Sequence, residues 1–194
     1  MAVLRLCYAD PPYLGCADRY REHPEAGRWD DAAAHGELMA DMQARYDGWA
    51  LSASAMSLPH ILPLAPEGIR VAAWVKPFSA FKKHVRIAYG WEPVIFRPAR
   101  KLSDPDAPEG RDWLSCNMSL QRGVIGAKPW PFCRWVLDLL GYLEGDQVDD
   151  LFPGSGIMAQ VLAQGRLPLV NGHSMGKREP APELVPDKAR YDNA

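Results

Sequence analysis

A short apolar run ends in four residues that could hold an amine: Asp10, Pro11, Pro12 and Tyr13. The prolines stiffen the turn and remove backbone donors, which leaves the Asp10 carboxylate and the Pro11 carbonyl as hydrogen-bond acceptors. An exocyclic amine donates N–H groups to such a pair, and the Tyr13 ring can stack on a base that has left its duplex. A strand-ending turn with a core tyrosine gives the same pattern, so these residues alone leave both interpretations open.

A second segment suits ligand binding through the backbone. Residues 150–156 read DLFPGSG, after an apolar run and before a helical pattern. Glycines let the backbone approach a ligand closely, and a helix N-terminus favours polar or anionic groups. No Gly-Lys-Ser/Thr follows, so the segment is not a phosphate-binding loop. An ordinary glycine-rich turn between a strand and a helix is the alternative.

The elements that would position these segments alternate between strands and helices. Short apolar runs predict strands at 3–9, 49–53, 71–75, 85–88, 93–96, 147–152 and 167–170. Helical spacing predicts helices at 31–46, 57–64, 129–143 and 157–163. Residues 14–30 and 103–112 are polar or rich in Pro and Gly, so we expect loops there. The alternation predicts an α/β three-layer sandwich with a mostly parallel sheet, whose strand ends bind ligands.

Length and composition indicate one globular domain. The chain has 194 residues, of which 47% are hydrophobic and seven are tryptophan, enough for a core. We expect the domain to span 1–175 and a disordered tail, rich in Pro and charge, to span 176–194. No apolar run reaches the ~20 residues of a membrane helix, and an early acid excludes a signal peptide. Four cysteines without a CxxC pair predict reduced thiols in a cytoplasmic protein, and the histidines have no metal-ligand spacing.

Basic residues concentrate between positions 76 and 101. This segment has seven Lys/Arg and one acid, whereas the rest of the chain has 15 basic and 23 acidic residues. Such a segment can contact a polyanion, although a solvated charged face gives the same pattern. The candidate phosphate contacts are Lys76, Lys82, Lys83 and Arg86.

Together these segments resemble the S-adenosylmethionine (SAM)-dependent amino-methyltransferases of nucleic acids. Residues 10–13 look like the family's catalytic motif IV, residues 150–156 like its cofactor motif I, and Lys128-Pro129 like its motif X. The catalytic motif comes first, which is the permuted order of the β-type bacterial and phage DNA methyltransferases and of the eukaryotic mRNA adenosine methyltransferase family. The resemblance covers residues 4–172 and implies a Rossmann-like fold with a seven-stranded type of sheet.

A further likeness to the mRNA enzymes lies in Trp74-Val75-Lys76, which is followed by a predicted strand carrying Glu92. The small size of the chain resembles stand-alone phage enzymes. About 30 residues separate the last central strand from Lys128, too few for a large target-recognition domain. We therefore expect a short recognition site, a single-stranded substrate, a homodimer or a partner subunit.

The resemblance implies methyl transfer from SAM to the N6 amine of a flipped-out adenine in DNA, without a metal. Asp10 and the Pro11 carbonyl would orient the amine, Pro12 would stiffen the turn, and Tyr13 would stack on the base. The implied SAM contacts are Lys128, Pro129, Asp150, Phe152, Gly154, Ser155, Gly156 and Asn171. Asn171 stands where many relatives have an acid that holds the ribose hydroxyls.

Other functions stay open at this point. The target could be the N4 amine of cytosine, or adenine in RNA, because nothing in the sequence selects for or against a 2′-hydroxyl. The chain could also be an inactive subunit that keeps the fold and binds nucleic acid. An unrelated α/β ligand-binding domain, in which both motifs are accidental, predicts no SAM binding at all.

Overall fold

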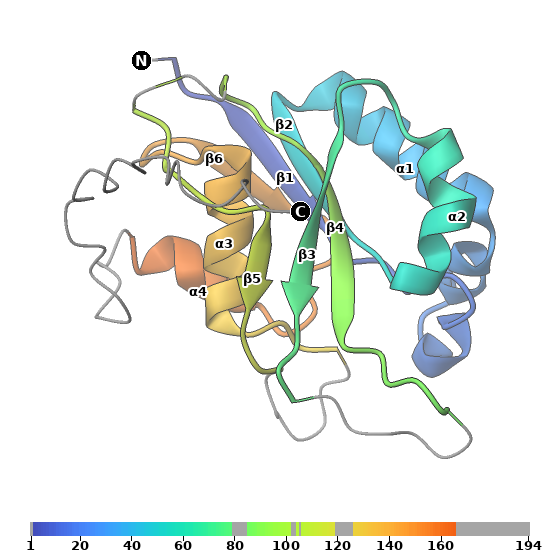
Figure 1. Cartoon of the computed structure of the whole chain (residues 1–194). Helices are drawn as coiled ribbons and strands as arrows, with labels where there is room; N and C mark the ends of the chain where they lie inside the picture. Colours follow the sequence, from blue (N-terminus) through green and yellow to red (C-terminus); the bar gives the residue numbers. More distant parts are fainter. Residues whose placement is uncertain (1, 79–84, 102–103, 105, 119–125, 166–194) are drawn as a thin grey trace, which may run out of the picture.

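The computed structural model describes residues 2–78, 85–101, 104, 106–118 and 126–165, which form one sheet covered by helices on both faces (Figure 1). The helices α1 and α2 cover one face and α3 and α4 cover the other (Figure 1). The α/β three-layer arrangement expected from the sequence is therefore confirmed. No helix in these ranges is long and apolar enough to cross a membrane.

The sheet is mixed, with the strand order β5-β3-β4-β2-β1-β6. Its strands are β1 (Arg5–Ala9), β2 (Gly48–Ser52), β3 (Arg70–Val75), β4 (Trp91–Arg97), β5 (Trp113–Ser115) and β6 (Gln147–Asp150). β1 pairs in parallel with β2 and β6, and β3 pairs in parallel with β5. β4 runs antiparallel between β2 and β3. One strand thus runs against the other five described strands.

The helices begin and end where the local sequence favours it. They are α1 (Ala32–Arg45), α2 (Leu58–Ile61), α3 (Trp130–Leu140) and α4 (Ile157–Ala163), with short 3-10 turns η1 (Ala17–Tyr20), η2 (Ala26–Asp30), η3 (Ala55–Ser57) and η4 (Leu62–Leu64). The Asp31 carboxylate caps α1 by accepting from Ala33 N at 2.9 Å. α3 ends at Gly141, which has a left-handed φ of 74° that favours glycine.

Side chains alternate along the central strand β1, so the core is divided between the two faces of the sheet. Leu6 and Tyr8 face α3 and α4 and pack in one apolar cluster with Phe132. Cys7 and Ala9 face the other way and pack against α1 and α2. β1 is therefore buried on both sides, and the residues that directly follow it are held in a fixed position.

Two expectations about strands were incomplete or wrong. Residues 85–88 form no strand, and Arg86 and Ile87 are exposed, because this short apolar alternation has no neighbouring strand to pair with. β5 was missed, since three residues are too few to give a periodic signal. The seventh strand expected at 167–170, the domain end at 175 and the tail 176–194 lie outside the described residues.

Candidate active site

Polar side chains from four strands meet at one edge of the sheet. The carboxyl ends of β1, β3 and β6 lie at this edge, and the antiparallel β4 begins there. Asp10 follows β1, Lys76 follows β3, Glu92 is the second residue of β4, and Asp150 ends β6. The register pairs Tyr8 with Asp150 and Trp74 with Glu92, which brings these residues of distant sequence segments together.

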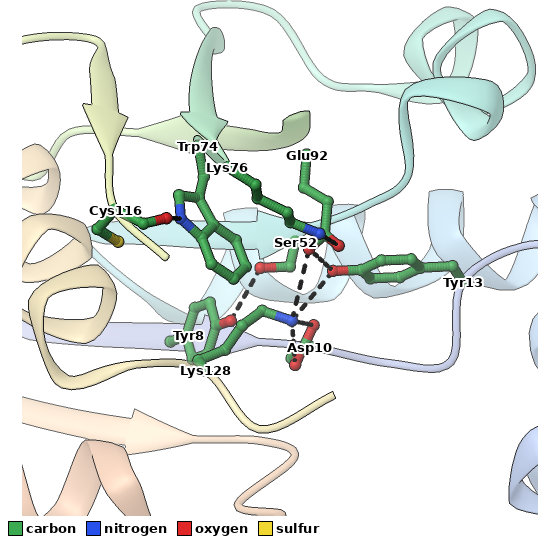
Figure 2. A network of polar contacts seen from close by, with 9 residues as sticks. All are labelled: Tyr8, Asp10, Tyr13, Ser52, Trp74, Lys76, Glu92, Cys116 and Lys128. Atoms are coloured by element: carbon green, nitrogen blue, oxygen red, sulfur yellow. Dashed lines mark hydrogen bonds and ion pairs between the residues drawn. The ribbon is translucent and has the colours of Figure 1, made fainter. Parts of the chain in front are cut away.

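Lys128 connects the predicted catalytic residues (Figure 2). Its Nζ donates to both oxygens of Asp10, at 2.8 Å to Oδ1 and 2.7 Å to Oδ2, and to the Tyr13 hydroxyl at 3.0 Å. The Tyr13 hydroxyl in turn donates to Glu92 Oε2 at 2.8 Å. The side chains of Lys128 and Asp10 are only 8% and 20% exposed, so solvent screens this pair weakly.

A second lysine neutralises Glu92 from the other side. Lys76 Nζ donates to Glu92 Oε1 and lies 4.7 Å from the centroid of the Trp74 ring. The Trp74 indole donates to the Cys116 carbonyl at 3.0 Å, which fixes its ring (Figure 2). The two oxygens of Glu92 thus have different partners, Lys76 on one and Tyr13 on the other.

Burial and neighbouring charges shift the ionisation of this cluster. Burial raises the pKa of Asp10, Glu92 adds to the effect, and Lys128 opposes it. Burial alone would lower the pKa of Lys128, but the carboxylates of Asp10 and Glu92 outweigh it and raise that pKa. Burial, with the same two carboxylates, raises the pKa of Tyr13 well above its ordinary value. Tyr13 therefore stays a neutral hydroxyl that both donates and accepts.

Two cavities open at this cluster. Cavity A has a volume of about 520 Å³ and lies beside residues 150–155 and the segment from η1 to η2. Cavity B has a volume of about 630 Å³ and lies beside Tyr13, the end of β3 and the start of β4. Both cavities are lined by Asp10, Tyr20, Gly126, Ala127 and Lys128. Asp10 and Lys128 therefore stand at the boundary between two spaces that each suit a small ligand.

Cavity A has the features of a site for a nucleoside with a charged end. Phe152 and Trp29 form an aromatic wall, with ring centroids 5.2 Å apart in an edge-to-face arrangement. Gly154 has a φ of 45° and Gly156 a φ of 70°, so the turn exposes backbone that side chains would otherwise cover. Burial, with a smaller contribution from Asp10, raises the pKa of Asp150, whose Oδ1 accepts from Phe152 N at 3.2 Å.

The structure brings together most of the site residues expected from the sequence. Asp10, Tyr13 and Lys128 are in direct contact, and five others line cavity A: Pro12, Asp150, Phe152, Gly154 and Ser155. Pro11 is buried beside them, Pro129 precedes α3, and Gly156 precedes α4, and none of these three lines either cavity. Lys82, Lys83 and Asn171 lie outside the described residues.

The expected phosphate contacts occupy different environments. Lys76 is buried and paired with Glu92 inside the cluster, so its role toward a phosphate stays a prediction. Arg86 is exposed, as a phosphate contact would be. Among the residues that the site adds are Glu92, Tyr20 and Trp29. Glu92 had a signal, because it is the one acid in the basic segment, whereas the other two lay in an apparent loop.

Comparisons with known proteins show a fold and nothing finer. No family model matches the chain, and no curated protein does. Among solved structures, M1.HpyAVI in complex with SAM matches with 16% identity and a TM-score of 0.54, over 84% of this chain and 78% of that one. A second structure of M1.HpyAVI matches with 15% identity and a TM-score of 0.52, over 84% and 77%.

A DNA modification methylase from Thermus thermophilus matches more weakly, with 14% identity and a TM-score of 0.45, over 84% of this chain and 77% of that one. The fold assignment rests on the two M1.HpyAVI structures, because their TM-scores exceed 0.5. The chain thus has the α/β fold of M1.HpyAVI, a protein that has been crystallised with SAM.

Proposed function

We propose that this protein transfers a methyl group from SAM to the N6 amine of a flipped-out adenine in DNA. The observation that carries the proposal is the meeting of two cavities at Asp10. A transfer between two molecules needs both held in line at one point, and such positioning supplies much of the rate enhancement. The acceptor groups at that point are of the kind that orient an amine.

Cavity A would hold the cofactor. The wall of Phe152 and Trp29 suits an adenine ring, Asp150 is an acceptor for hydroxyl or ammonium groups, and Gly154 allows a close approach of backbone. The fold shared with M1.HpyAVI, which was crystallised with SAM, supports the same assignment. When bound, SAM supplies a methyl group already activated by its sulfonium.

Cavity B would hold the target base. Tyr13, Trp74 and Trp91 give it aromatic faces on which a base can stack. Stacking is worth about 1–3 kcal/mol per base, and extruding a base costs a few kcal/mol, so the cavity can offset much of that cost. Asp10 and the Pro11 carbonyl then accept from the amine and direct the nitrogen lone pair toward the methyl group.

The choice of adenine in DNA follows from the resemblance of residues 10–13, since the form ending in tyrosine is typical of adenine enzymes. The basic residues Arg86, Lys82 and Lys83 would contact phosphates, and binding should then weaken steeply with salt. Cytosine or RNA would use the same two cavities and the same Asp10.

The test is methyl transfer from labelled SAM to single-stranded DNA, duplex DNA and RNA, with the nucleosides resolved by mass spectrometry. We expect N6-methyladenine from DNA. N4-methylcytosine, or label in RNA alone, would contradict the base or the polymer assigned here. Cofactor binding without transfer to any polymer would favour the inactive binding subunit.

A further inference from the structure

We propose that Lys128 is a positioning residue that occupies Asp10 in the free protein and moves to Glu92 when a positively charged cofactor enters cavity A. Asp10 then becomes available to the target amine. This inference rests on the proposed function and adds a coupling between the two cavities. It starts from one feature of the cluster in Figure 2: the groups of Asp10 that should receive a substrate are already in use.

The lysine ammonium occupies the position of the target nitrogen. Both Asp10 oxygens accept from Lys128 Nζ, at 2.8 and 2.7 Å, which are ordinary distances for any N–H donor on a carboxylate. An amine that donates to the same oxygens at the same distance would overlap the ammonium. The free protein thus holds an internal donor where the external one has to bind.

A second carboxylate lies within reach of that ammonium. Glu92 Oε2 is 3.9 Å from Lys128 Nζ, and the Tyr13 hydroxyl already contacts both groups. Lys76 neutralises the other oxygen, Oε1, whereas the donor that Tyr13 offers to Oε2 is a neutral hydroxyl. A rotation about the end of the lysine side chain suffices for the exchange, and the backbone of 126–128 keeps its place.

The charge of the cofactor supplies the driving force. Asp10 and Lys128 line both cavities, so a sulfonium in cavity A brings a second positive charge next to one carboxylate. Two cations beside one buried anion repel each other, since screening is weak there. Moving Lys128 to Glu92 relieves the repulsion and leaves Asp10 facing the sulfonium and the target amine.

Methyl transfer reverses the bias. The N–C bond forms as the C–S bond breaks, sulfur keeps the electron pair and becomes a neutral thioether, and the amine nitrogen loses one proton to solvent by way of Asp10. The product amine has one N–H donor fewer, and the cofactor no longer repels Lys128. Lys128 returns to Asp10 and displaces the methylated base, so it favours binding before transfer and release after it.

The experiment compares the affinity for a nucleic acid in the presence of two cofactor analogues. A fluorescent single-stranded oligodeoxynucleotide of mixed sequence is titrated with protein saturated either with sinefungin, which has an ammonium near the position of the sulfonium, or with the neutral S-adenosylhomocysteine. We expect the wild type to bind the oligonucleotide about 5- to 150-fold more tightly with sinefungin, the usual range of coupling between two sites.

The variants assign that ratio to particular residues. Lys128→Met should give a ratio near one, and Glu92→Gln should lower the ratio while keeping the affinity measured with S-adenosylhomocysteine. Lys101→Met, which changes an exposed lysine that lines neither cavity, should keep the wild-type ratio. Glu92→Gln keeps the size of the side chain, so it remains informative if Lys128→Met folds poorly.

Cofactor affinity measured by calorimetry separates the two levels of the account. Equal oligonucleotide affinity with both analogues, when both bind the wild type, would overturn the positioning role of Lys128 and leave the proposed function standing. A ratio that persists in Lys128→Met would overturn it as well. Failure of both analogues to bind would overturn the proposed function together with this inference.

Discussion

Tyr13 fixes its ring with its own hydroxyl, which accepts from Lys128 at 3.0 Å and donates to Glu92 at 2.8 Å. A ring held in this way is oriented before any base arrives, so little conformational freedom is lost on stacking. The same two contacts place the ring beside the ammonium of Lys128, 5.3 Å from the ring centroid. The residue therefore has two separable contributions, the face of its ring and the hydrogen bonds of its hydroxyl.

Substitutions at Tyr13 should separate these contributions. Tyr13→Ala removes the ring and should weaken oligonucleotide binding by about 1–3 kcal/mol, the value of one stacked base. Tyr13→Phe keeps the ring and should retain most of that affinity, while transfer slows because the ring is less firmly held. Fluorescence anisotropy and single-turnover transfer measure the two effects, and an equal loss of binding in both variants would argue against stacking.

At the scale of elements, the turn between β6 and α4 shapes cavity A. Gly154 has a φ of 45°, a region that side chains with a Cβ rarely adopt, although a Cβ there would have no neighbour closer than 3.7 Å. The constraint is therefore conformational and not steric. The turn needs a glycine to keep its backbone directed toward the cavity.

Gly154→Ala should raise the dissociation constant for S-adenosylhomocysteine and lower the free energy of unfolding by about 1–2 kcal/mol, the cost of a left-handed non-glycine residue. Gly110→Ala is the matched control, because a Cβ there also meets nothing within 4 Å and its φ is not in the left-handed region. Calorimetry and thermal unfolding measure both quantities. An unchanged cofactor affinity in Gly154→Ala would contradict the placement of the cofactor in cavity A.

Elements were easier to predict than their neighbours in the sheet. The period of apolar residues gave β1, β6 and α4 nearly at their observed bounds, since these segments are buried on a face that the pattern records. The same reasoning wrongly placed a strand at 85–88, because alternation alone does not say whether a partner strand exists. The turns η1 and η2 had no periodic signal, so the wall that Trp29 adds to cavity A was missed.

At the scale of the molecule, the edge of the sheet opposite the site has its own fastening. Arg100 is buried and donates to Asp146 Oδ2 at 2.7 Å and Oδ1 at 3.0 Å, and to the Gly141 carbonyl. Asp146 also accepts from the backbone N–H of Leu4 and Leu143. These contacts join the segments before β1, after β4 and before β6, far in sequence from one another.

Asp146→Asn should lower the free energy of unfolding by about 3–5 kcal/mol, the cost of leaving one partner of a buried pair uncompensated. The exposed pair Arg70–Asp112, at 3.4 Å, offers the control Asp112→Asn, for which we expect about 0–1 kcal/mol. Chemical denaturation gives both values. Cofactor affinity should not change in either variant, because neither carboxylate lines cavity A.

The same pair predicts how stability depends on pH. Burial alone would raise the pKa of Asp146, but Arg100 and the two backbone N–H groups outweigh it and lower that pKa below the ordinary 3.8. A carboxyl group with a lowered pKa in the folded state stabilises that state above the ordinary value and loses this contribution as the pH falls. The wild type should therefore lose more stability than Asp146→Asn on acidification from pH 7 to pH 3; an equal loss would contradict the role of the pair.

The candidate site was only partly readable from the sequence, for a physical reason. Asp10, Tyr13 and Asp150 lie directly after or at the ends of buried strands, a position that the local sequence reveals. The contact of Lys128 with Asp10 joins residues 118 positions apart, and Glu92 reaches Tyr13 across 79 positions. Such contacts depend on strand order and register, which the hydrophobic pattern of single strands does not specify.

Dependence of transfer on Asp10 is the most direct test of the claim that both cavities serve one reaction. The rate of methyl transfer from SAM to adenine-containing DNA is measured for the wild type, for Asp10→Ala and for Asp18→Ala, an exposed carboxylate outside both cavities. We predict that Asp10→Ala still binds cofactor but forms no N6-methyladenine, whereas Asp18→Ala matches the wild type. Transfer by Asp10→Ala at the wild-type rate would contradict the account.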